Sequence, residues 1–290
     1  MNLESFANMF VAGITLGAIY LLMAIGLTLV FGITKVLNYA QGSFFTWGGY
    51  LTWILTTKYV QWGYPVVIPI VMLVAFCAGI LFERVIVRPL RRFSGWETTA
   101  IIVTLGCALV LDNLALVLFD PLSKTIPNLM EGAFRFGGLS IAKHNAIMIV
   151  ITIAVLVLLW LFLEKTRVGM GLRAVSQDIT GARIVGLPVD RLYGYSFGIC
   201  TALAALAAIL LIPRTLLYPL VGWTTLLKAF VVIVLGGLGN IKGTLIAAFM
   251  LGQAEIFITY YVGGMWALPI FLVLLVATLA ISPKGLFGRW

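Results

Sequence analysis

The chain has 290 residues, of which 62% are hydrophobic and 10% charged, and its formal net charge is +9. An ordinary soluble domain carries about 25% charged residues, so this composition excludes that class and indicates a polytopic membrane protein. In a soluble protein the positive charge would suggest nucleic acid. Here the lysines and arginines occupy short segments between apolar runs, where they set orientation in the membrane, and we expect no nucleic-acid partner.

The first apolar run covers residues 6–33, enough to cross a hydrocarbon core that needs about 20 helical residues. A polar break follows at residues 34–42, and a short apolar segment then continues to Thr57. The break is either an ordinary turn with helix caps or an irregular segment that lines a cavity. Its candidate pathway residues are Asn38, Gln41, Gly42 and Ser43.

Residues 64–83, 98–119 and 146–163 are the next expected spans. The first of them ends in a basic run, which marks the cytoplasmic side by the positive-inside rule or offers a contact surface to a soluble partner. Glu83 could pair with Arg84 or with another neighbour. The run contains Arg84, Arg88, Arg91 and Arg92.

Asp112 lies inside the span at residues 98–119, where an ionisable group is costly. Two roles are open for it, a structural cap or ion pair and a position on a transport pathway. The single histidine, His144, lies in the loop at residues 120–145, and we expect it at the surface or as a cap, with no role in metal binding or catalysis.

Residues 164–191 form a polar segment that holds eight of the 29 charged residues. Leu172, Val175, Ile179 and Ala182 recur at helical spacing, which predicts one or two amphipathic helices. Pro188 cannot continue such a helix, so the element should end near Gly186. Two spans separate this segment from the basic run, so both should face the cytoplasm. The opposite, polar face carries Arg173, Gln177 and Asp178.

Four further runs follow, at residues 193–212, 226–238, 243–262 and 265–281, before Lys284 and Arg289. A second break after the short run contains Gly236, Gly237 and Asn240. Because it has no GxxxxGK[ST] spacing, it is not a phosphate loop. Paired with the break around Asn38, it suggests corresponding breaks in two halves of a transporter and thus a candidate pathway. Glu255, within a span, is either a structural partner or a pathway group.

The predicted fold is therefore a single all-α membrane domain over residues 1–290, with two interrupted helices and a cytoplasmic helical loop at residues 164–192. Nine crossings would place the N-terminus outside and the C-terminus inside. If residues 226–238 are re-entrant, the number is eight. Cys77, Cys107 and Cys200 lie far apart within apolar runs, so we expect neither a disulfide nor a metal site.

Four stretches carry a resemblance to a known family: LNYAQGSFFTWGGYL, ERVIVRPLR, RAVSQDITGARIVGLPVDRLYGYSFGICTALAALAA and KAFVVIVLGGLGNIKGTLIAAFMLGQAE. Their order and spacing resemble the membrane subunits of branched-chain amino-acid ABC importers, in particular the shorter, LivH-type permease. The resemblance implies a multi-pass permease in the cytoplasmic membrane of a prokaryote. It also implies a second, LivM-type permease, two cytoplasmic ATPases that hold ATP and Mg²⁺, and an extracytoplasmic binding protein; this chain itself would need no cofactor.

The ATPase-docking loop of that family falls on residues 173–186. The resemblance implies alternating access driven through this loop, in which polar residues contact the ATPase and apolar ones such as Leu172, Val175 and Ile179 pack into its groove. The candidate coupling residues are Leu172, Arg173, Val175, Gln177, Asp178, Ile179, Ala182, Arg183 and Gly186.

Other functions remain open. Relatives in the same family carry urea or short amides, and a secondary transporter could couple Asp112 or Glu255 to protons. A purely structural membrane subunit is also compatible with the sequence. An integral-membrane enzyme is disfavoured, because the chain has no HExxH motif and its one histidine lies in a loop.

Overall fold

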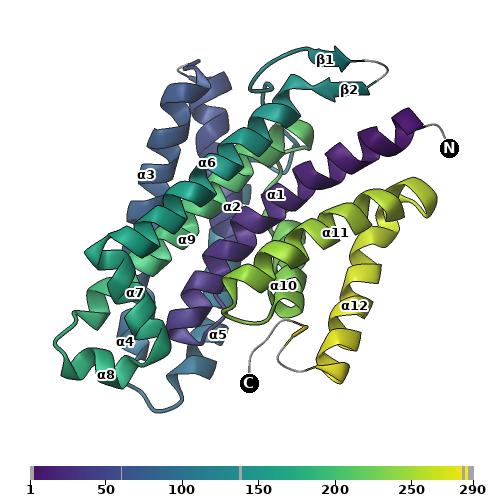
Figure 1. Cartoon of the computed structure of the whole chain (residues 1–290). Helices are drawn as coiled ribbons and strands as arrows, with labels where there is room; N and C mark the ends of the chain where they lie inside the picture. Colours follow the sequence, from purple (N-terminus) through teal and green to yellow (C-terminus); the bar gives the residue numbers. More distant parts are fainter. Residues whose placement is uncertain (1–2, 60, 137–138, 283–284, 287–290) are drawn as a thin grey trace.

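The computed structural model of the chain describes residues 3–59, 61–136, 139–282 and 285–286, and most of them are helical (Figure 1). Lys284 and Arg289 lie outside the described residues. The elements in chain order are α1 (Leu3–Thr34), α2 (Gln41–Trp53), α3 (Tyr64–Phe82), α4 (Arg88–Leu90), α5 (Trp96–Phe119), β1 (Ala133–Phe136), β2 (Leu139–Ala142), α6 (Lys143–Lys165), α7 (Arg167–Gln177), α8 (Ile179–Ile184), α9 (Val189–Leu211), α10 (Val221–Gly236), α11 (Ile241–Tyr261) and α12 (Ala267–Ile281).

The predicted class, a helical membrane bundle, is confirmed. Seven helices in the described part of the chain are long and apolar enough to cross a bilayer, namely α1, α3 with its continuation through α4, α5, α6, α9, α11 and α12. The two remaining expected crossings contain the shorter helices α2 and α10. Each of these is preceded by irregular backbone, at residues 35–40 and 215–220.

The helices run between two ends of the bundle. Figure 1 shows α4, α7 and α8 at one end, which we call the α7–α8 end, and the β1–β2 pair at the other, which we call the hairpin end. The first helix begins at the hairpin end, and α12 finishes at the α7–α8 end. The basic run around α4 therefore lies on the same side as the polar segment at residues 164–191, as the sequence predicted.

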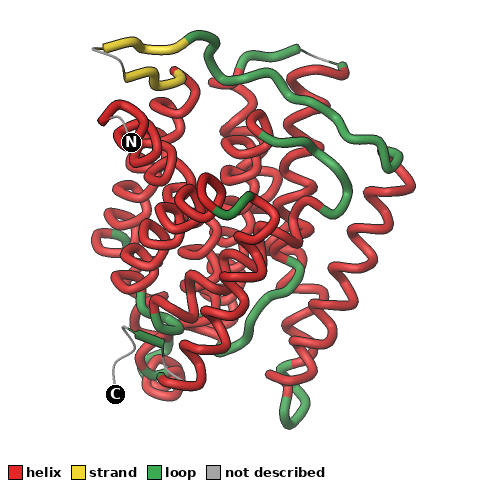
Figure 2. Tube along the Cα trace, turned by 90° about the vertical axis from the view of Figure 1, so that its right-hand side faces the viewer, coloured by secondary structure: helices red, strands yellow, loops and turns green. Residues whose placement is uncertain are grey.

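The connection after α5 contains a small hairpin that the all-α prediction did not include. Its strands β1 and β2 are antiparallel, with Ala133 opposite Ala142. Figure 2 shows the loop that leaves α5 crossing the end of the bundle to reach this hairpin. Along this loop, Lys124 forms an isolated antiparallel bridge with Leu217, in the segment between α9 and α10. The hairpin end is thus tied together by backbone hydrogen bonds.

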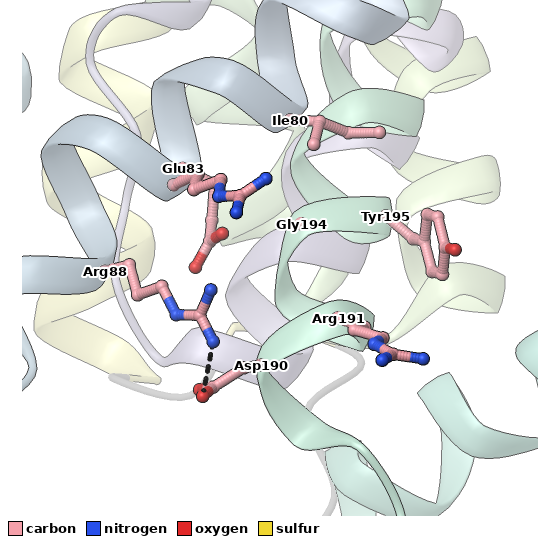
Figure 3. Close-up of a pocket in the computed structure, with 8 residues that line it drawn as sticks. Ile80, Glu83, Arg88, Asp190, Arg191, Gly194 and Tyr195 are labelled. Carbon is pink, nitrogen blue, oxygen red and sulfur yellow. Dashed lines mark hydrogen bonds and ion pairs between the residues drawn. The ribbon is translucent and has the colours of Figure 1, made fainter.

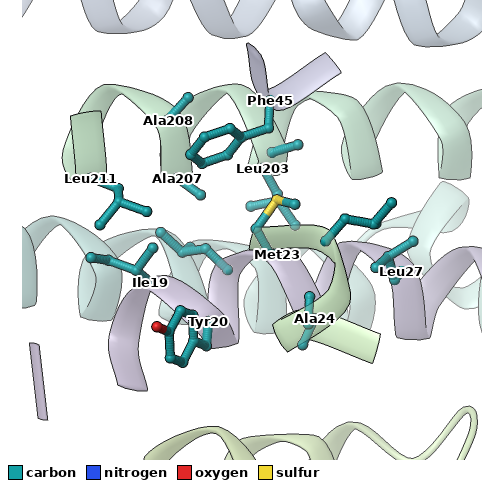
Figure 4. Packing of buried hydrophobic residues seen from close by; sticks show 14 of the residues in the cluster. Ile19, Tyr20, Met23, Ala24, Leu27, Phe45, Leu203, Ala207, Ala208 and Leu211 are labelled. Carbon is teal, nitrogen blue, oxygen red and sulfur yellow. The ribbon is translucent and has the colours of Figure 1, made fainter. Parts of the chain in front are cut away.

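The core of the bundle is formed by α1 and α9, and the second half of α1 packs against α9. Small residues on α9, including Ala204, Ala207 and Ala208, have no exposed surface and let the neighbouring helix approach closely (Figure 4). Ile19 and Met23 of α1 fill the facing positions and are also fully buried. Van der Waals packing of this kind is what holds helices together in lipid, where no hydrophobic force acts between them.

Two three-helix units, α1–α2–α3 and α9–α10–α11, are related by inversion. The long first helix runs toward the α7–α8 end in one unit and away from it in the other, and each is followed by a short helix. The units interlock, because α1 packs on α11 and α9 packs on α3. An internal repeat was predicted, but its correspondence is corrected. The partner of residues 35–40 is the segment at residues 215–220, not the turn at residues 236–240.

Candidate functional site

The first break returns the chain into the bundle, so that α2 begins in the middle of the molecule. The side-chain amide of Gln41 donates to the carbonyl of Cys200 at 2.8 Å, and the Cys200 thiol donates back to the amide oxygen at 3.0 Å. Cys200 is the twelfth of the 23 residues of α9. The start of α2 therefore lies level with the middle of a spanning helix.

Irregular backbone at this depth needs partners inside the protein, and residues 35–40 have them. The backbone N–H of Ala40 donates to the side-chain oxygen of Asn38 at 3.1 Å, and the N–H of Tyr39 donates to the Thr104 hydroxyl at 3.3 Å. The Ser43 hydroxyl donates to a carbonyl of α5 at 3.2 Å. Asn38 is 1% exposed, and its Nδ2 has no hydrogen-bond partner among the described residues.

The short helix α10 begins against the start of α2. The N–H of Gly222 donates to the Thr46 hydroxyl at 3.1 Å. A Cβ atom added at Gly222 would lie only 1.9 Å from the carbonyl oxygen of Gly42, so the two backbones are in direct contact. Only glycine permits this approach. We call this contact the half-helix junction, and its close packing shuts the bundle at that point.

The segment that leads into α10 leaves α9 at the hairpin end, where Leu217 bridges Lys124. Residues 215–220 run from the hairpin end back to the half-helix junction, where Leu217 packs against Gly49 of α2. The signal in the sequence was the pair Pro213 and Pro219, which interrupt helical hydrogen bonding on both sides of this segment.

The structure places Gly236, Gly237 and Asn240 elsewhere, in the turn between α10 and α11 at the α7–α8 end. Gly237 has a φ of 86°, and the side-chain oxygen of Asn240 caps α11 by accepting from Gly243 at 3.2 Å. A Cβ atom at Gly239 would lie 3.6 Å from the Cα of Gly32, so this turn packs on the end of α1. The two predicted breaks thus contact different parts of the chain.

Asp112 joins α5 to α10. It is 2% exposed, and the indole N–H of Trp223 donates to its carboxylate at 2.6 Å. Its burial and this hydrogen bond are those of a structural tie between the two helices. Trp223 directly follows Gly222, so this hydrogen bond fixes α10 close to the half-helix junction.

Glu255 belongs to a triad of side chains from three helices. Lys228 of α10 forms an ion pair with it at 2.6 Å, and the Tyr20 hydroxyl of α1 donates to its other oxygen at 2.5 Å. Lys228 also contacts the Tyr20 oxygen at 3.1 Å. The lysine and glutamate side chains remain 19% and 12% exposed. Sequence analysis missed Lys228, although a single lysine within an apolar 16-residue helix is itself a signal.

His144 is buried, so the expectation of a surface position is wrong. It is 3% exposed at the start of α6, where its Nδ1 accepts from the Leu129 N–H at 3.2 Å and its Nε2 lies 3.2 Å from the Leu210 carbonyl. These contacts join the loop after α5 to the end of α9. Among the residues that the structure describes, no group of three or more His, Cys, Asp or Glu side chains is arranged to hold a metal ion.

The polar segment at residues 164–191 folds into the two predicted short helices. Thr166 caps α7 by accepting from the Gly169 N–H at 3.0 Å, and Asp178 caps α8 by accepting from the Thr180 N–H at 2.9 Å. Gly186, with a φ of 79°, ends the element ahead of Pro188, as predicted.

The apolar face of these helices packs inside the chain, which corrects one part of the prediction. Leu172, Val175 and Ala182 are 1%, 0% and 4% exposed, and they pack with α1, α6 and α9. Ile179 lies partly buried against the same cluster. These side chains are occupied within the subunit, so they are not available to enter a groove on a partner.

A different set of residues from the segment faces outward. The sequence missed the strongest apolar members, Ile184 and Val185, which are 80% and 75% exposed. They follow directly after Arg183 at the end of α8. Together these exposed residues form a surface that we call the α8 surface: Arg173, Gln177, Asp178, Thr180, Arg183, Ile184, Val185 and Gly186.

The inner side of α7 borders a cavity of about 60 Å³ that connects it to two other elements. Leu172 and Ser176 line it from α7, and Ile33 lines it from the last turn of α1. Gly239 and Ile241 line it from the turn before α11. The segment at residues 164–191 therefore packs on the end of α1 and faces the turn that contains Asn240 across this cavity.

Comparison with known proteins gives a consistent family. The model of the branched-chain amino acid transport system permease component matches residues 9–280. The high-affinity branched-chain amino acid transport system permease protein BraD of Pseudomonas aeruginosa is 33% identical, covering 98% of this chain and 96% of that protein. LivH of Escherichia coli K12 is 29% identical, covering 75% of this chain and 72% of that protein.

A probable LivH permease of Methanocaldococcus jannaschii is also 29% identical, over 76% of this chain and 73% of that protein. Among solved structures, PsaBC from Streptococcus pneumoniae in complex with Fab has a TM-score of 0.49 at 15% identity, over 96% of this chain and 92% of that chain. That likeness is too distant to carry an argument, whereas the family match spans nearly all of the bundle described above. The chain therefore belongs to the family of branched-chain amino acid transport system permease components.

Proposed function

We propose that the chain translocates branched-chain amino acids across the cytoplasmic membrane of a prokaryote as the permease subunit of an ABC importer. The support is the family match and the names of its relatives BraD and LivH, both permeases of high-affinity branched-chain amino acid transport systems. ATP and Mg²⁺ belong to separate cytoplasmic ATPase subunits, and an extracytoplasmic binding protein delivers the cargo. A second permease, of the LivM type, completes the membrane part.

The observation that carries this proposal is the α8 surface. Ile184 and Val185 expose two apolar side chains on a capped helix, beside the charged residues Arg183 and Asp178. An exposed apolar pair with a charged rim is typical of a protein contact site. It lies at the basic end of the bundle, which the positive-inside rule assigns to the cytoplasm. A cytoplasmic ATPase is the partner that this position fits.

The pathway opens, on this proposal, where α2 and α10 meet. Asn38, Gln41, Gly42 and Ser43 gather at the half-helix junction, and the unpartnered amide of Asn38 supplies a polar group at membrane depth. The turn of Gly236, Gly237 and Asn240 would act at the α7–α8 end, next to the ATPase. The junction is closed by backbone contact, so transport requires α2 and α10 to separate by alternating access.

The alternatives differ in cargo or in energy source. Urea or short amides would use the same machinery with a different binding protein. A secondary transporter would couple Glu255 to an ion and need no ATPase. Competition of leucine uptake by urea and acetamide distinguishes branched-chain amino acids from urea or short amides as the cargo. Uptake without the ATPase subunits would identify a secondary transporter.

The decisive experiment targets the α8 surface. We expect the double variant Ile184→Asp and Val185→Asp to insert normally but to lose copurification with the ATPase subunits and ATP-dependent leucine uptake. Burying two unpaired carboxylates in an apolar contact costs several kcal/mol. The matched control is Met265→Asp, because Met265 is 92% exposed in the short connection between α11 and α12. Copurification and uptake equal to those of Met265→Asp would show that the ATPase docks elsewhere.

A further inference from the structure

An arginine-rich pocket lies where α3 and α9 reach the α7–α8 end. It has a volume of about 480 Å³ and is lined from one side by Glu83, Arg84 and Arg88, and from the other by Asp190 and Arg191 (Figure 3). Arg88 forms an ion pair with Asp190 at 2.8 Å. Glu83 pairs with Arg91, rather than with the adjacent arginine considered from the sequence.

The pocket and the two hollows beside it together carry a net positive charge. They are lined by six arginines and only two carboxylates, Glu83 and Asp190. Arg91 is held by both carboxylates and stacks on Tyr193 at 4.2 Å, yet its Nε is buried without a hydrogen-bond partner among the described residues. A buried guanidinium donor without a partner is unfavourable. The arrangement fits an anionic group, and arginine forks match phosphate oxygens best.

An apolar groove continues from this pocket along the membrane-spanning part of the bundle. It has a volume of about 610 Å³, and α9 forms its floor while α3 and α6 form its sides. Tyr195 lines both the pocket and the groove, so the two border each other at this residue. The rims are open to the outside, since Leu73 of α3 and Leu158 of α6 are each 63% exposed.

The dimensions suit a lipid that lies in one leaflet. Asp190 in the pocket and Leu203 in the groove are 13 residues apart on α9, which at 1.5 Å per residue is about 20 Å. Half of a hydrocarbon core is about 15 Å thick. The basic pocket lies on the side that the arginines assign to the cytoplasm, where basic pockets between spanning helices hold lipid headgroups.

We propose that this pocket and groove bind one anionic phospholipid, with its phosphate among Arg84, Arg88 and Arg191 and one acyl chain along α9. The groove decides against an acidic segment of a soluble partner, because such a partner could fill the pocket but would not follow an apolar channel into the membrane. The net positive charge of the pocket and the length of the groove both match a single anionic lipid molecule.

The test uses the full chain purified with its partner subunits. Native mass spectrometry counts phosphatidylglycerol retained after exchange into phosphatidylcholine nanodiscs. We expect one phosphatidylglycerol per chain, a preference lost in the double variant Arg84→Gln and Arg191→Gln. The loss should be about 30-fold, since each basic residue near a membrane surface contributes roughly fivefold. The control Lys58→Gln removes an exposed charge from the segment between α2 and α3, away from the pocket lining, and should change nothing.

Two further measurements distinguish binding of a whole lipid from binding of a phosphate group alone. Leu158→Trp narrows the groove without touching the arginines and should also weaken retention, whereas binding of phosphate alone would be insensitive to it. Excess inorganic phosphate should not displace the lipid. The proposal is overturned if phosphatidylcholine is retained equally well, if the arginine variant retains as much phosphatidylglycerol as Lys58→Gln, or if a cross-link from Leu73→Cys shows a second permease seated in the groove.

Discussion

The two short helices α2 and α10 begin at the same point but have different surroundings. The start of α2 is neutral and buried, with Gln41 and Ser43 no more than 2% exposed and bonded to neighbouring helices. In contrast, α10 carries Lys228, whose charge is paired with Glu255 and remains partly exposed. An ionised group at membrane depth is costly unless it faces protein or water. The start of α2 is therefore the neutral side of the junction, and α10 presents the charged side.

The largest effect should follow from Lys228→Met, which leaves Glu255 without its cation. Breaking a buried ion pair from one side costs about 3–5 kcal/mol, so the free energy of unfolding of the chain in detergent should fall by that amount. The double variant Lys228→Met and Glu255→Gln removes both charges and keeps a hydrogen-bond partner for Tyr20, and it should recover most of the loss. Equal stability of the single and double variants would mean that the charge of α10 is already solvated.

A smaller loss of stability is expected from Gly222→Ala, which tests whether α2 and α10 depend on their close contact at the half-helix junction. The added methyl group would meet the Gly42 carbonyl, so α10 must shift, at a cost of about 1–3 kcal/mol. Gly106→Ala is the matched control, because a Cβ atom there meets nothing within 4 Å and alanine favours a helix by up to about 1 kcal/mol. Thermal unfolding of the two variants measures the difference. A Gly222→Ala protein as stable as Gly106→Ala would contradict the contact.

The smallest effect is predicted for Gln41→Met on the neutral side. It removes the hydrogen bonds between α2 and Cys200 and should cost about 1 kcal/mol. In a background with Cys77→Ser and Cys107→Ser, maleimide should then label Cys200 faster, because the start of α2 is loosened. Asn113→Leu is the control, since Asn113 also donates to a helix carbonyl but lies exposed on α5. Unchanged labelling in Gln41→Met would show that α2 is held by packing alone.

Much of the fold could be predicted from hydropathy and charge. Long apolar runs have few alternatives to a spanning helix, and the arginines at residues 84–92 marked one face correctly. Caps and periodicity also located α7 and α8. The contact made by their apolar face could not be predicted, because periodicity shows which side is apolar and not what covers it. Leu172 and Val175 are covered by the subunit itself.

The two predicted breaks, around Asn38 and Asn240, show a second limit of prediction from the sequence. Glycine and asparagine mark a turn wherever it lies, so the turn at Asn240 and the junction at Gly42 have similar signals in the sequence. Their depth is decided by packing, here by the contact between Gly42 and Gly222, which are 180 positions apart. For the same reason Glu255 could be singled out as unusual while its partner Lys228 could not, since only the fold brings α10 and α11 into register.

The small cavity beside α7 bears on how the movements of α2 and α10 are coordinated. Leu172 touches the last turn of α1, which leads within a few residues into α2, and the same cavity is bordered by Gly239, in the turn that follows α10. A displacement of α7 would therefore bear on both the segment before α2 and the turn after α10. The two halves of the junction would move in synchrony, without any separate signal passing between them.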